Sequence, residues 1–82
     1  MEDDATVHSE TGISQWVVYE HPRDYPEQYV LRRWIIAKGM IIATHDVVLA
    51  DSLEEIRKAV PAGLYCLPRF AEDDPCIVES WL

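Results

Sequence analysis

The sequence predicts an α+β domain, a small antiparallel sheet of four to five strands with one helix packed on one face, in the order β-β-β-α-β-β. Three observations predict this class. Short runs rich in β-branched and aromatic residues recur along the chain, one segment has helical spacing with its own start signal, and prolines and isolated glycines separate these segments. With 82 residues, 49% of them hydrophobic, the chain has enough material for one core. The other face of the sheet is expected to be partly exposed.

The beginning of the chain differs in character from the rest. Residues 1–14 are polar and acidic without sustained apolar periodicity, so we expect a flexible acidic N-terminal tail followed by a single domain over residues 15–82. The first strand is predicted over residues 15–20, where β-branched and aromatic residues follow one another. It ends at His21-Pro22, because proline lacks the N–H that a strand ladder needs and restricts the residue before it.

A loop and a hairpin follow the first strand. Residues 22–28 contain two prolines, which exclude a helix or a central strand, and they offer an aromatic candidate for binding, Tyr25. Strands are predicted over residues 29–37 and 40–44, joined by a tight turn at Lys38-Gly39 in which the glycine takes a positive φ.

Alternation along the second strand sorts its side chains onto two faces. Arg32 and Trp34 share one face, and Arg33 lies on the other. After residues 40–44, His45-Asp46 interrupts the apolar pattern before a second apolar run over residues 47–50, which predicts either a bulge in one long strand or a break into two short strands.

The single helix has a clear start signal. Ser52 and Glu55 form a capping box, in which the serine side chain accepts from the third residue's amide and the glutamate reaches back. The segment ends before Pro61, and two more strands are predicted over residues 64–67 and 76–82. The apolar stripe that covers the sheet consists of Leu53, Ile56 and Val60, and the solvent-facing residues are Glu54, Glu55, Arg57 and Lys58.

Charge and cysteine content restrict the classes of function. Seven Lys and Arg against fifteen Asp and Glu give a formal net charge of −8, which disfavours direct binding to nucleic acid. No apolar run approaches the ~20 residues of a membrane span, and acidic residues stand where a secretory signal would be basic and apolar, so a cytoplasmic protein is expected. In a reducing compartment Cys66 and Cys76 are expected to be free, largely buried thiols rather than a disulfide.

Catalytic chemistry has little support in the residues. His21, Asp24 and His45 are candidate ligands for a metal-dependent small enzyme, because imidazoles with a carboxylate suit zinc, but their spacing favours exposed or loop-capping histidines. Neither cysteine has a histidine or lysine nearby in sequence, and the three glycines are isolated, so neither a thiol nucleophile nor a phosphate loop is predicted. We therefore expect no enzyme activity, no cofactor and no metal.

A basic and aromatic run is the main candidate for binding. Arg32, Arg33 and Trp34 are residue types enriched in binding hot spots. In the alternative, the arginine stems pack over the sheet and their charged ends pair with Glu20 or Glu79. Three Trp and four Tyr exceed what so small a core readily hides, which favours a protein-binding surface.

The folded part also contains a dense acidic group. Glu72, Asp73 and Asp74, with Glu79 further on, are interpreted first as a solvated loop and second as a docking patch for basic side chains.

Three phrases carry a resemblance to known proteins. They are WVVYEHPRDYP over residues 16–26, GLYCLPR over residues 63–69 and DDPCIVESW over residues 73–81. With them the chain resembles small single-domain proteins of bacteria and phages. The resemblance implies a bacterial or phage setting and a shared fold, and it implies no activity and no site residue.

These observations together predict a non-enzymatic protein-interaction module of bacterial or phage origin. One form of it is an acidic inhibitor that occludes a basic, nucleic-acid-handling partner, as anti-CRISPR proteins do. The alternative is a homodimeric structural protein that pairs edge strands or open faces. The candidate contact residues are Tyr25, Arg32, Arg33, Trp34, Glu72, Asp73 and Asp74.

Overall fold

A five-stranded antiparallel sheet with one short helix forms the fold in the computed structural model, which describes residues 12–70 and 73–82. The elements are β1 (Ile13–Glu20), β2 (Tyr29–Ala37), β3 (Met40–Ala50), α2 (Leu53–Lys58), β4 (Cys66–Pro68) and β5 (Ile77–Trp81). Their order along the chain confirms the predicted α+β class. In the sheet the strands lie in the order β3-β2-β1-β5-β4, so β1 is central and β3 and β4 are the edges.

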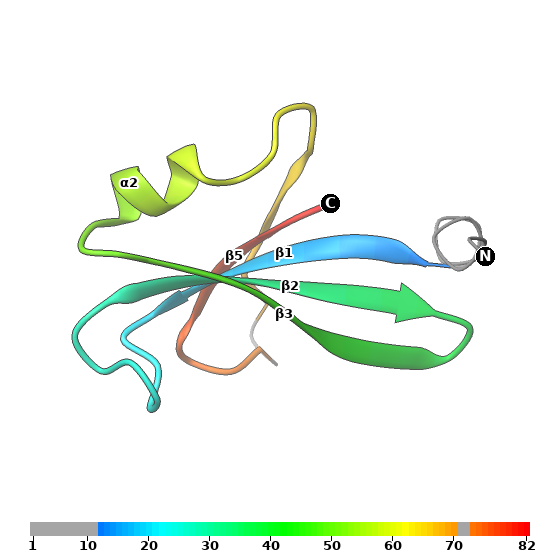
Figure 1. Ribbon diagram of the computed structural model, residues 1–82, viewed down its shortest axis with the longest axis horizontal. Coiled ribbons are helices and arrows are strands. Elements are labelled where there is room, and N and C mark those ends of the chain that lie inside the picture. Colours follow the sequence, from blue (N-terminus) through cyan, green and yellow to red (C-terminus); the bar gives the residue numbers. More distant parts are fainter. Residues whose placement is uncertain (1–11, 71–72) are drawn as a thin grey trace.

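The core lies between the helix and one face of the sheet. Val18 of β1 and Leu31 of β2 are directly paired and fully buried, and Ile56 of α2 packs on them. Figure 1 shows the helix over one end of the sheet, with the β2–β3 turn at the opposite end. The distal half of that hairpin therefore extends beyond the part of the sheet that the helix covers.

Strand β1 begins earlier than predicted. Ile13 pairs with Ile36 and Ser14 with Ile35, so both residues belong to the sheet and not to an N-terminal tail. The reason is the length of β2, which offers partners beyond the apolar run that marked the strand in the sequence. Residues 1–11 of the predicted tail lie outside the described residues.

The β2–β3 turn and the interruption of β3 follow from local chemistry. Lys38 and Gly39 have φ values of 23° and 76°, the pair of positive values that tight hairpin turns favour, which confirms the predicted turn. Arg32 pairs with Val47 and Trp34 with Ala43, so residues 44–46 together stand opposite a single residue of β2. Strand β3 is therefore one long strand with a bulge.

The bulge is held by a side chain. The Thr44 hydroxyl donates to the carbonyl oxygen of Arg33 at 2.8 Å and accepts from the N–H of Asp46 at 3.1 Å. These bonds replace ladder bonds that the extra residues displace.

The helix has the predicted serine cap, but among the described hydrogen bonds the Glu55 side chain does not reach back to Ser52. The Ser52 hydroxyl accepts from the N–H of Glu55 at 3.1 Å, and Ile56 is its buried residue. No helix in the described part of the chain has the length and apolar character needed to cross a membrane.

Candidate protein-binding face

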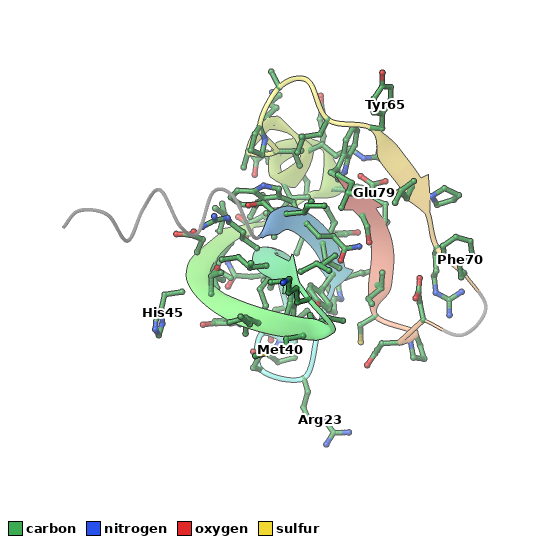
Figure 2. The ribbon with its side chains drawn as sticks, turned by 90° about the vertical axis from the view of Figure 1, so that its right-hand side faces the viewer. Arg23, Met40, His45, Tyr65, Phe70 and Glu79 are labelled. Atoms are coloured by element: carbon green, nitrogen blue, oxygen red, sulfur yellow. The ribbon has the colours of Figure 1, made fainter. Side chains whose placement is uncertain are left out.

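The face of the sheet opposite the helix is hollowed. Figure 2 shows β3 and β5 on either side of the central strands, both curving away from the helix. The curvature leaves a groove of about 390 Å³. Its lining comes from four strands and the loop before β5 and consists of Gln15, Val17, Tyr19, Trp34, Ile41, Asp73, Ile77 and Ser80.

Two aromatic residues form the centre of this groove. Tyr19 and Trp34 are half-buried, and the indole Nε1–H of Trp34 donates to the Tyr19 hydroxyl at 3.2 Å. Burial raises the pKa of the Tyr19 phenol, so the hydroxyl is neutral at physiological pH. The pair thus offers an apolar surface with one fixed hydroxyl group, a combination found at protein interfaces.

Arg32 lies on the same face as Trp34, as the alternation predicted. Its Nη2 lies 3.2 Å from Oδ2 of Asp24, in the loop between β1 and β2. A smaller hollow of about 180 Å³ lies beside this pair, between Tyr19 and Val30. Arg32 therefore connects the loop to the open face.

Tyr25 is held within that loop. Its N–H donates to the carbonyl oxygen of Pro22 at 3.0 Å, and the residue is half-buried rather than fully exposed. At the base of the loop His21 and Tyr29 make an edge-to-face contact, with ring centroids 5.4 Å apart.

Arg33 lies on the helix side of the sheet and is absent from the groove lining. Its Nη1 lies 2.7 Å from Oδ2 of Asp46, and its Nε–H donates to the Ser14 hydroxyl at 2.9 Å. Arg32 and Arg33 are thus both paired with a carboxylate. The expectation that their partners are Glu20 or Glu79 was wrong, since the partners are aspartates. The bulge in β3 and the loop after β1 place aspartates closer to the guanidinium groups.

Glu79 is instead bound by the helix. It is 5% exposed and accepts two hydrogen bonds from Arg57, at 3.0 Å from Nε and 2.8 Å from Nη2, and a third from Nε1 of Trp81 at 2.9 Å. The Arg57 hydrogen bonds hold the pKa of the Glu79 carboxyl below its usual value. Arg57 was predicted to be a solvent-facing residue, and its sequence position gave no sign of this partner.

The acidic loop has a structural role. Oδ2 of Asp73 accepts from the N–H of Phe70, and Oδ1 of Asp74 accepts from the N–H of Cys76, both at 2.9 Å. Asp73 also lies at the rim of the groove. Glu72, the third predicted acidic contact residue, lies outside the described residues.

The candidate metal ligands are not brought together. Among the described residues no group of three or more His, Cys, Asp and Glu side chains has the arrangement of a metal site. Asp24 pairs with Arg32, and Figure 2 shows His45 pointing away from the sheet at its β3 side.

Both cysteines are free, but the expectation that both are largely buried was wrong. Cys66 is exposed because β4 is a short edge strand, and Cys76 is half-buried. Desolvation, with the nearby Glu79 and Asp74 carboxylates, raises the pKa of the Cys66 and Cys76 thiols respectively. A raised pKa keeps a thiol protonated at neutral pH and makes it a poor nucleophile.

No family model matches this chain, and neither a curated protein nor a solved structure matches it. The class of protein that the fold and the groove define is a small α+β domain with one concave, aromatic sheet face.

Proposed function

We propose that this chain is a non-enzymatic protein-interaction module that binds an extended, basic segment of a protein partner in the groove opposite the helix. The observation that carries the proposal is the aromatic centre of the groove, where Tyr19 and Trp34 are fixed to each other and half-exposed. Pre-ordered aromatic side chains in a concavity are typical anchors of protein interfaces, because little conformational entropy is lost when they are covered.

The lining indicates the chemistry of the partner segment. Val17 and Ile77 flank the aromatic pair and favour an apolar partner side chain, and Gln15 and Ser80 supply hydrogen-bonding groups beside it. Asp73 at the rim and the formal net charge of −8 favour basic residues next to that apolar side chain.

The net charge also supports a narrower form of the proposal. In this form the partner is a basic, nucleic-acid-handling protein, and the module blocks the surface that would bind nucleic acid. A bacterial or phage setting rests on the three sequence phrases. A cytoplasmic, reducing location fits the two free cysteines.

The experiment that tests the proposal uses two opposite substitutions at one groove position. Gln15 lies in the groove on β1, half-buried. Immobilised wild-type chain, Gln15→Lys and Gln15→Glu are used to capture partners from nuclease-treated bacterial lysate, and the retained proteins are identified by mass spectrometry. A basic partner should bind Gln15→Lys about tenfold or more weaker than the wild type and should bind Gln15→Glu at least as well, since tenfold corresponds to ~1.4 kcal/mol.

A second variant and a control complete the test. Trp34→Ala removes the aromatic anchor and should lose the same partner, while Tyr65→Ala, at a residue 81% exposed beside β4, should retain it. Circular dichroism establishes that each variant is folded. Equal retention by folded Gln15→Lys, Gln15→Glu and Trp34→Ala would overturn the proposal.

A further inference from the structure

A second concavity adjoins the groove on the same face of the sheet. It is the smaller hollow of about 180 Å³, and Tyr19 lines both concavities. The groove follows β1, since Gln15, Val17 and Tyr19 are successive residues of that strand on one face. Beyond Tyr19 the hollow continues to Pro22 and Asp24 of the following loop. A segment bound along the groove therefore reaches the hollow.

The lining of the hollow combines apolar and charged groups. Val30, which is fully buried, Pro22 and Tyr19 supply the apolar part, and Asp24 and Arg32 supply the charges. The aliphatic stem of a lysine or arginine packs on apolar surface of this kind while its charged end stays at the polar side. A cation is also attracted to the face of an aromatic ring.

Asp24 retains capacity for a second cation. Its side chain is 57% exposed, and Arg32 reaches it by a single contact of 3.2 Å between Nη2 and Oδ2. Among the described residues no donor contacts the other oxygen, Oδ1. Figure 2 shows that Arg23, the other arginine next to this carboxylate in the sequence, points away from the sheet. Because a carboxylate has about four acceptor sites, an added ammonium or guanidinium group can bind without displacing Arg32.

Negative charge outweighs positive charge at this end of the groove. Burial is the largest cause of the raised pKa of Tyr19, and the charges that also act on this pKa are those of Arg32, Asp74 and Asp24. One guanidinium group therefore stands against two carboxylates from two different loops. A third carboxylate, that of Asp73, lies at the rim of the groove. The local excess of negative charge favours a cationic occupant.

We infer that the smaller hollow is the subsite for a basic side chain of the bound segment, a lysine or arginine whose stem lies against Tyr19 and Val30 and whose cation binds the Asp24 carboxylate. The inference rests on the proposed function and deepens it, because it assigns the basic residue of the partner to one position on the face. Charge complementarity selects this occupant, since an acidic side chain would be repelled by Asp24 and Asp74.

The geometry of the face restricts where the basic residue stands in the segment. Val17 in the groove and Tyr19 at the hollow are two positions apart on β1, which is about 7 Å in a strand. An extended segment that follows β1 alternates its side chains with the same period. The apolar side chain in the groove and the basic side chain in the hollow should therefore be two or four positions apart.

The first part of the test selects ligands from a phage-displayed library of random ten-residue peptides on the immobilised full chain. The wild type should select peptides with a lysine or arginine two or four positions from a large apolar residue. Asp24→Asn removes the carboxylate charge and should select the apolar residue without that basic preference. Asp46→Asn is the matched control, since Asp46 also pairs with an arginine, Arg33, and is 55% exposed, but on the helix side of the sheet. Circular dichroism establishes that each variant is folded.

The second part measures the coupling between Asp24 and the basic residue of the peptide. One selected peptide and a copy with glutamine in place of the basic residue are titrated by fluorescence anisotropy. The glutamine peptide should bind the wild type and Asp46→Asn about tenfold weaker than the parent peptide does. With Asp24→Asn the loss should shrink to about threefold or less, and the difference between the two losses is the interaction term of a double-mutant cycle.

The outcomes separate this inference from the groove proposal. Equal losses with Asp24→Asn and the wild type, or selection of acidic residues at that spacing, would contradict the inference; the groove proposal stands in that case if Trp34→Ala still abolishes binding. Failure to select any peptide that requires Trp34 would overturn the groove proposal, and the assignment of the hollow with it.

Discussion

Glu79 is the charged side chain that the described residues bury, and its environment explains why burial is tolerated. Its carboxylate accepts three hydrogen bonds, two from Arg57 and one from Trp81. Since these donors replace water, the carboxylate remains ionised at 5% exposure. The ion pair ties α2 to β5, which are otherwise joined through the apolar core.

The pair can be tested with two neighbouring helix residues. Arg57→Met should lower the free energy of unfolding by about 2 kcal/mol, because it leaves Glu79 buried without its charged partner. This loss is smaller than the ~3–5 kcal/mol that removal of one partner costs in a fully buried ion pair, because the Arg57 side chain is 49% exposed. Lys58→Met is the control, since Lys58 is exposed and is the next residue of the same helix. Urea denaturation measures both, and equal effects would exclude a specific role for the pair.

Glu79 also makes stability depend on pH. Its pKa is lowered in the folded protein, first of all by the Arg57 hydrogen bonds, so the unfolded chain takes up a proton at higher pH than the folded one. The stabilisation is therefore present above the ordinary glutamate pKa of ~4.3 and is lost as pH falls towards the lower folded pKa. Urea denaturation between about pH 3 and 7 should show that the stability difference between the wild type and Glu79→Gln shrinks below pH ~4.3. A constant difference would mean that Glu79 is not the titrating group.

Among the elements, α2 depends on the N-cap residue that precedes it, Ser52. The helix has six residues, too few to be stable on its own, so it is held by packing and by its cap. Ser52→Ala removes the hydroxyl that accepts from the N–H of Glu55 and should cost about 1 kcal/mol of unfolding free energy. Ser52→Asp retains an acceptor at the cap and should be close to the wild type in thermal unfolding. If Ser52→Asp loses as much as Ser52→Ala, the cap is not the cause.

Elements defined by local signals were predictable from the sequence. The cap at Ser52 and the turn at Lys38-Gly39 involve residues at most three positions apart, and strand alternation correctly separated Arg32 from Arg33. The sequence could not distinguish a bulge at His45-Asp46 from a break into two strands, because a bulge depends on how β3 pairs with β2.

Contacts between distant residues were not predictable. Arg57 and Glu79 are 22 positions apart, and the register of β5 against β1 shifts between Val18 and Tyr19, which alternation alone does not reveal. The groove has the same origin. Gln15, Trp34 and Ile77 come from three strands, and only the order and curvature of the sheet bring them together.

At the scale of the whole molecule, the net charge determines the electrostatic contribution to binding in the groove. Fifteen acidic residues against seven basic ones give the chain an excess of negative charge. This acidity attracts the basic segment proposed for the groove. The electrostatic contribution to that binding is therefore favourable.

The favourable electrostatic contribution gives a prediction for ionic strength. Raising NaCl from about 0.05 to 0.5 M shortens the Debye length to well below ~10 Å, which screens the attraction between the acidic chain and a basic partner while leaving apolar contacts in place. Binding of a basic partner in the groove should therefore become weaker, by several-fold in its dissociation constant, when measured by retention on the immobilised chain over a series of salt concentrations. Unchanged retention across this range would mean that the net charge contributes little to binding and that the apolar contacts of the groove hold the partner.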